Sequence, residues 1–176
     1  SMPAQSTLRA NGSGMIHPYT MDGAPVTFIQ DVNFDGTIRS SDGDRVYLYM
    51  GMRRGGKGYY AFDITDPEAP KLMWRISKGG DFGELGYTFS NPRIGMIESA
   101  LGPRPVVMFA GGYDFNKDTR GVVGTDDKEG NALYVVDAET GKLIWKARRG
   151  SRGAGTGVYE HPDMKDSIPS TLTVVD

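Results

Sequence analysis

The stretch ALYVVDAETGKLIW, residues 132–145, decides the fold. Two apolar runs flank a polar centre, and the centre holds residues that favour a tight turn. The Asp137 side chain is suited to cap this turn, and Gly141 readily adopts a positive φ angle. The stretch therefore predicts a strand, a tight turn and a second strand that carries Trp145.

An equivalent arrangement occurs earlier in the chain, where Asp63 and Trp74 correspond to Asp137 and Trp145. Three short strands are predicted in each unit. Those of the first unit are VYLYMGM (46–52), GYYAFDIT (58–65) and KLMWRIS (71–77). Those of the second unit are VVMFAGG (106–112), NALYVVD (131–137) and KLIWKAR (142–148). A further run, opened by a proline and closed by a carboxylate, precedes each unit and recurs a third time: PVTFIQD (25–31), PRIGMIE (92–98) and PSTLTVVD (169–176). The chain therefore predicts two complete four-stranded units and the first strand of a third.

Repeated four-stranded antiparallel units predict an all-β protein, and more specifically a partial β-propeller of about two and a third blades. The stretch around Trp145 resembles the tryptophan-docking repeat of quinoprotein propellers, in which this side chain would fill the space between blades. A β-sandwich with accidental internal similarity is the alternative. We interpret residues 1–11 as a cloning scar (Ser1-Met2) with a flexible lead-in, and residues 12–176 as the propeller fragment.

The composition excludes several functional classes. The 176 residues carry 20 Lys and Arg against 22 Asp and Glu, a net charge of −2. This balance argues against nucleic acid as a partner and against a polybasic membrane surface. There is no cysteine, so disulfides, zinc–thiolate sites and cysteine nucleophiles are excluded. No apolar run approaches the ~18 residues of a membrane span and no signal peptide is visible, so we expect no membrane insertion and place any export signal upstream.

The loop DVNFDGTIRSSDGD, residues 31–44, predicts a calcium site. Calcium prefers about six to eight oxygen ligands, and Gly36 permits the sharp turn that brings alternate side chains to one centre. Predicted strands flank the loop, so it would be an EF-hand-like loop in a β setting. The candidate ligands are five side chains and one backbone carbonyl, that of Thr37: Asp31, Asn33, Asp35, Thr37, Asp42 and Asp44. Asp42 fits the twelfth EF-hand position and Asp44 directly precedes the next strand, so either acid is a candidate to close the shell. The alternative is a hairpin loop without metal, since Asp, Asn and Gly also favour turns.

Other stretches are interpreted without a catalytic role. Residues 114–129 begin like the calcium loop but lack its glycine, which favours a solvated acidic loop. Residues 51–58 nearly match a phosphate-binding loop, but a glycine replaces the magnesium-binding Ser or Thr and a strand follows, so we reject nucleotide binding. The glycine-rich residues 150–157 are expected to form a flexible loop. His17 and His161 are the only histidines and lie far apart in sequence, so no histidine metal cluster is predicted.

Several motifs in combination resemble the PilY/PilC-type proteins. They are GMRRGGKGYYAFDITDP (51–67), PKLMW (70–74), LGYTFSNP (85–92), FAGGYD (109–114), the Trp145 repeat and SIPS (167–170). The resemblance extends from about residue 12 to the end of the chain. It implies the C-terminal β-propeller domain of a type IV pilus tip-associated adhesin and biogenesis factor, a protein that is not an enzyme.

The resemblance also implies a function for calcium. In that family, calcium bound to a loop of the form D-x-N/D-x-D-G-x-x-D regulates pilus extension against retraction, and so twitching motility and surface attachment. Residues 31–36 match this form, whereas Arg39 replaces the closing acid, and Asp44-Arg45 restores the family's Asp-Arg pair five residues later. The implied partners are pilus components and a host or abiotic surface, and the implied location is the cell surface, pilus tip or outer membrane.

Two other hypotheses remain open. The tryptophan repeat suggests a fragment of a quinone-dependent dehydrogenase, but the vicinal cysteines that such active sites commonly use are absent. An outer-membrane assembly scaffold with a similar propeller would lack the acidic loop at 31–44. Strand edges left open at 25–31 or 169–176 predict self-association.

Overall fold

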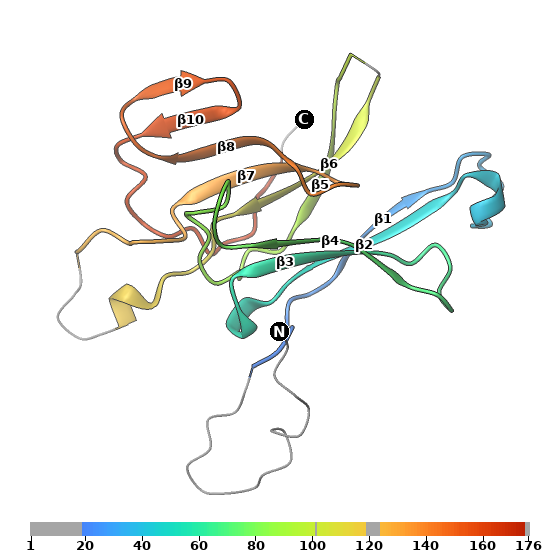
Figure 1. The fold of residues 1–176 in the computed structure, drawn as a ribbon, viewed down its shortest axis with the longest axis horizontal. Helices are drawn as coiled ribbons and strands as arrows, with labels where there is room; N and C mark the ends of the chain where they lie inside the picture. Colours follow the sequence, from blue (N-terminus) through green and yellow to red (C-terminus); the bar gives the residue numbers. More distant parts are fainter. Residues whose placement is uncertain (1–18, 101, 119–123, 175–176) are drawn as a thin grey trace, which may run out of the picture.

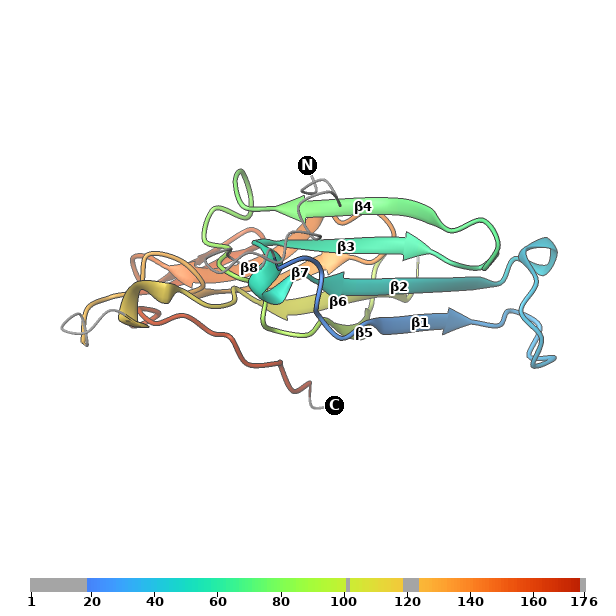
Figure 2. The same cartoon turned by 90° about the horizontal axis from the view of Figure 1, so that it is seen from below.

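The computed structural model describes residues 19–100, 102–118 and 124–174, and their regular structure is almost entirely β-strand. Two sheets pack against each other (Figures 1 and 2). Within the described residues, no helix has the length and apolar character needed to span a membrane. The predicted scar and lead-in, residues 1–11, lie outside the described part of the chain.

The first sheet is the first predicted unit. Its four antiparallel strands follow the order β1-β2-β3-β4. They are β1 (Val26–Gln30), β2 (Arg45–Gly51), β3 (Gly58–Asp63) and β4 (Lys71–Ser77). Buried and more exposed residues alternate along β2 and β4, as expected for strands with one face in the core. The prediction of a four-stranded unit is confirmed.

The second sheet repeats this order in β5-β6-β7-β8 and then continues through two more strands, β10 and β9. Its strands are β5 (Arg93–Ile97), β6 (Arg104–Ala110), β7 (Ala132–Asp137), β8 (Leu143–Arg149), β9 (Gly153–Gly155) and β10 (Val158–His161). β10 pairs in parallel with β8, and β9 pairs with β10. The expected flexible loop at 150–157 is therefore wrong, because backbone hydrogen bonds to β10 order Gly153–Gly155 despite the low strand preference of glycine.

The predicted third repeat of the opening strand is not seen. Residues 169–174 carry no strand, and Ile168 makes only an isolated bridge to Gly112. A strand needs a ladder of backbone hydrogen bonds along its length. Within the described residues, Thr171 and Leu172 are instead held by single hydrogen bonds from the Asn91 N–H (3.3 Å) and the Arg93 guanidinium (3.2 Å). Asp176, at the end of the predicted strand, lies outside the described residues.

Aromatic side chains fill the space between the sheets. The rings of Tyr59 on β3 and Phe109 on β6 pack in a tilted arrangement with centroids 4.1 Å apart, and the Phe109 centroid lies 5.4 Å from that of Tyr134 on β7. The exposed fraction of these three side chains is 1% or less. Aromatic pairs at such distances add to the free energy gained by burial, so they form the centre of the core.

Trp74 is the side chain of the first sheet that docks on the second. Its indole Nε1–H donates a hydrogen bond of 2.9 Å to the Ala138 carbonyl in the turn after β7, where the Tyr49 hydroxyl also donates, at 3.2 Å. A Cβ atom at Gly141 would lie 2.8 Å from the Trp74 ring, so only glycine fits beneath the indole. The docking position predicted for Trp145 is therefore wrong, because Trp145 is 36% exposed; the equivalent Trp74 is the side chain that docks between the sheets.

Glu84 fastens the connection between β4 and β5 to the second sheet. Its carboxylate accepts hydrogen bonds from the Tyr134 hydroxyl (3.2 Å), Lys146 (3.2 Å) and Arg148 (3.1 Å). Burial alone would raise the pKa of the Glu84 carboxyl, but the hydrogen bond from Arg148 and the charge of Lys146 lower the pKa below its usual 4.5. The ionised carboxylate is therefore the form that the folded state stabilises.

We expect Trp74→Ala to lower the free energy of unfolding by about 3–5 kcal/mol, because it removes a buried ring and leaves a cavity between the sheets. Urea unfolding followed by circular dichroism measures this loss. Trp145→Ala is the matched control, and we expect a loss of only about 1 kcal/mol, since Trp145 is partly exposed. Equal losses in the two variants would contradict the docking function of Trp74.

We expect Glu84→Gln to lower the free energy of unfolding at pH 7 by about 1–2 kcal/mol. A carboxyl whose pKa is depressed in the folded state stabilises the protein above its unfolded pKa, and this contribution disappears as the pH falls through the folded pKa. The difference between wild type and variant should therefore shrink as the pH falls below 4.5. Urea titrations at several pH values measure it, with the exposed Glu68→Gln as control; a difference that stays constant down to low pH would be inconsistent with the ion pairs.

Candidate metal centre

The predicted calcium loop joins β1 to β2 and extends beyond the end of the first sheet (Figure 1). Residues 40–42 form a short 3-10 turn inside it. Gly36 has φ +77°, and Phe34 has φ +57° and is 90% exposed. The left-handed conformation that the sequence predicts at Gly36 is therefore present, and the loop bends back on itself.

Hydrogen bonds within the loop orient its first three polar side chains. Asp31 Oδ2 accepts the Gly36 backbone N–H at 2.8 Å. Asn33 Oδ1 accepts the Asp35 N–H at 3.1 Å, and Asp35 Oδ1 accepts the Thr37 N–H at 2.7 Å. The Thr37 N–H, followed by the Arg39 guanidinium, lowers the pKa of Asp35. The loop therefore holds this carboxylate ionised, as a calcium ligand must be.

One oxygen in this loop has no partner. Asp31 Oδ1 is buried and accepts no hydrogen bond, while Oδ2 of the same carboxylate is bound by Gly36. A buried acceptor without a donor is costly unless a cation satisfies it. The donor set of carboxylate, amide and carbonyl oxygens is the one that calcium prefers, so the residues fit the predicted ion.

Asp44 has a different function from the other acids. Its side chain is completely buried, and its two oxygens accept the backbone N–H groups of Val32 (2.9 Å) and Arg39 (2.8 Å). The carboxylate thus ties the two arms of the loop together at its base. Since both oxygens already bind backbone, the sequence-based choice between Asp42 and Asp44 now favours Asp42 as the closing acid.

Positive and donor groups lie between the remaining acids. Asn33 Nδ2 lies 3.3 Å from Asp35 Oδ2 and 3.4 Å from Asp42 Oδ2. Arg39 Nη1 lies 2.9 Å from Asp35 Oδ2 and 3.6 Å from Asp42 Oδ2. Within the described residues, no group of three or more Asp, Glu or His side chains converges closely enough to hold a metal in this arrangement. The acids are neighbours, but their oxygens are shared with Asn33 and Arg39.

The second acidic stretch is not the solvated loop that the sequence predicts. Asp114, Asp127 and Glu129 are each 9% exposed or less. The Asp114 carboxylate accepts three backbone N–H groups, at 2.8, 2.9 and 3.3 Å. Glu129 pairs with Lys57 at 2.5 Å and with Lys78, which flank strands of the first sheet. The prediction failed because these lysines are distant in sequence; the acids fasten this loop to the first sheet.

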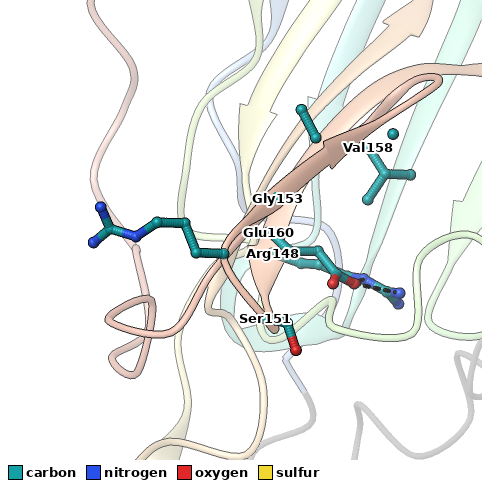
Figure 3. A pocket seen from close by; sticks show the side chains of 8 residues that line it. Arg148, Ser151, Gly153, Val158 and Glu160 are labelled. Carbon is teal, nitrogen blue, oxygen red and sulfur yellow. Dashed lines mark hydrogen bonds and ion pairs between the residues drawn. The ribbon is translucent and has the colours of Figure 1, made fainter.

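Neither glycine-rich stretch leads into an α-helix within the described residues. Residues 51–58 connect β2 to β3, which begins at Gly58. A hollow of about 440 Å³ lies beside β9 and β10 (Figure 3). Its carboxylate, Glu160, pairs with Arg148 at 2.8 Å, and Arg148 also binds Glu84. The carboxylate of this hollow is therefore already engaged in an ion pair within the fold.

The sequence of this chain is similar to those of known proteins. The model of the PilY1 beta-propeller domain matches residues 6–168. The chain is 31% identical over 161 residues to the type IV pilus biogenesis factor PilY1 of Pseudomonas aeruginosa, covering 91% of this chain and 12% of that protein. It is 39% identical over 137 residues to a PilY1 homolog of Xylella fastidiosa, covering 71% of this chain and 11% of that protein.

A solved structure is also similar. The crystal structure of the Pseudomonas aeruginosa PilY1 C-terminal domain has a TM-score of 0.50 and 28% sequence identity, covering 77% of this chain and 23% of that one. The two sheets described above are therefore propeller blades, and the sandwich alternative is not supported. The chain spans only 11–12% of the length of the curated relatives.

We expect Asp44→Ala to destabilise the protein in calcium-free buffer by about 1–3 kcal/mol, because two backbone N–H groups lose their acceptor. Asp42→Ala is the control and should cost about 0.5 kcal/mol or less, since Asp42 makes only partly exposed contacts. Thermal unfolding in the presence of a chelator compares the two. If Asp42→Ala were the more damaging change, the assignment of Asp44 as the base of the loop would be wrong.

Proposed function

The chain belongs to the PilY1 β-propeller family, and on this premise we propose that it is a calcium-binding, non-enzymatic module of a type IV pilus biogenesis factor. Relatives that bear the name of pilus biogenesis factors support the pilus-related part of the proposal. The calcium-binding part depends on the loop between β1 and β2. The buried, unpartnered Asp31 Oδ1 is the observation that carries it.

The calcium ligands in this proposal come from one loop. They are side-chain oxygens and the Thr37 carbonyl: Asp31, Asn33, Asp35, Thr37 and Asp42. Asp44, which the sequence also offered as a ligand, instead holds the loop closed through the Val32 and Arg39 N–H groups. Bound calcium would supply positive charge that neutralises the carboxylates and orders the loop. The chain's own contribution is a pre-bent loop with ionised acids.

Ordering this loop would change the shape of an exposed surface of the protein and not a reaction centre. The loop projects from the end of the sheet and presents Phe34 and Val32, which are 90% and 49% exposed. We propose that the surface contacts other pilus components or a host or abiotic surface. In that way calcium would regulate pilus extension against retraction, twitching motility and attachment, at the cell surface, pilus tip or outer membrane.

The edges of the sheets provide a second route to partners. β1, β4, β5 and β9 lie at the ends of the two sheets, so each has one side without a paired strand within the described residues. Such edges pair readily with another strand. We therefore propose that the chain self-associates through these open edges at the ends of the two sheets.

We expect calcium to raise the Tm of the wild-type chain and to have no effect on Asp35→Ala. At a free calcium concentration about 100 times Kd, binding stabilises the folded state by about 2.7 kcal/mol, which corresponds to a rise in Tm of about 5–10 °C. Differential scanning calorimetry with calcium or with chelator measures the shift.

Glu68→Ala removes an exposed acid outside the loop and serves as the matched control. This variant should keep the full calcium response. A wild-type Tm that is the same in calcium and in chelator would rule out the calcium site and leave only the pilus-related part of the proposal.

A further inference from the structure

Arg39 binds two of the acids that are proposed as calcium ligands. Its Nη1 lies 2.9 Å from Asp35 Oδ2 and 3.6 Å from Asp42 Oδ2. Both acids belong to the ligand set proposed above. Arg39 is also the ninth residue of the loop, a position that supplies a ligand in EF-hand loops. A positive charge thus stands at a ligand position.

An arginine and a calcium ion cannot both satisfy these oxygens. The guanidinium is always charged and donates its N–H groups along the oxygen lone pairs. Calcium requires several of the same oxygens in its shell and repels a neighbouring positive charge. Binding of the ion therefore requires that the Arg39 side chain leave Asp35 and Asp42.

The structure makes this exchange easy. The side chains of Arg39 and Asp35 are 51% and 40% exposed, so the ion pair is weak and the guanidinium can move into water. The Arg39 backbone N–H is held separately by Asp44 Oδ2 at 2.8 Å. Side-chain rotation alone can therefore free the acids, while the bend of the loop is kept.

We infer that Arg39 is a tethered competitor of calcium, which neutralises Asp35 and Asp42 in the metal-free loop and sets the calcium concentration at which the loop fills. This inference rests on the proposed calcium site. Arg39 lowers the affinity for the ion and at the same time protects the empty loop from repulsion among its acids. The loop would therefore need a higher calcium concentration to bind the ion than the same loop without this arginine would need.

The test is a calorimetric titration of the full chain with calcium chloride at constant ionic strength. We expect Arg39→Gln to bind calcium about 3–10-fold more tightly than wild type, because one neighbouring positive charge is removed. Arg39→Lys retains the charge and should remain closer to wild type. Arg75→Gln, an exposed arginine on β4, is the charge-matched control and should leave the affinity unchanged within about twofold.

Thermal unfolding provides a second measurement. In chelator, Arg39→Gln should have a lower Tm than wild type, because its acids lose their counter-ion, and calcium should raise its Tm by more. Wild type that binds calcium with the same affinity as Arg39→Gln, or more tightly, would overturn the inference and leave the calcium site intact. If no variant, including Arg39→Gln, binds calcium, the proposed function itself fails and the inference with it. Binding by Arg39→Gln alone would support the inference.

Discussion

The carbonyl oxygen of Ala138 accepts hydrogen bonds from Trp74 and from Tyr49, and the arrangement of the two blades depends on this junction. Both donors come from the first sheet, and the acceptor lies in a turn of the second. Burial of the rings supplies the favourable free energy. The shared acceptor fixes the position of one sheet relative to the other, because a shift of either sheet would leave two buried donors unpaired. Gly141 completes the junction because no side chain separates its backbone from the indole.

The chain also has two acidic loops, between β1 and β2 and between β6 and β7, that begin alike and behave differently. In the loop that contains Asp114, the buried carboxylates bind backbone N–H groups and lysines, so their charges stabilise the fold. In the loop that contains Asp31, one buried oxygen is left without a donor and an exposed arginine neutralises the outer acids. In the first loop the buried Asp127 carboxylate is also paired with Lys117, whereas Asp31 Oδ1 in the second loop has no partner within the described residues.

Much of this architecture could be predicted from local sequence. The turn at Asp137 forms as expected: its carboxylate accepts the N–H groups of Glu139 (3.1 Å) and Thr140 (2.8 Å), and Gly141 has φ +68°. β9 and β10 could not be predicted, because β10 forms by parallel pairing with β8 and the glycine-rich β9 forms by pairing with β10. The candidate calcium loop was identified by residue type, but the burial of Asp44 depends on the Val32 and Arg39 backbone groups that fold against it.

The sequence by itself determined the four strands of each blade, their order and the candidate calcium loop, because alternation, turn residues and oxygen-bearing side chains act over short distances. Only the tertiary structure decided which tryptophan is buried, which acids are paired and which oxygen is free. Trp74 and Trp145 have nearly the same local sequence, yet only Trp74 meets a carbonyl acceptor on a neighbouring sheet. Burial and electrostatic pairing depend on residues distant in the chain, so local patterns do not specify them.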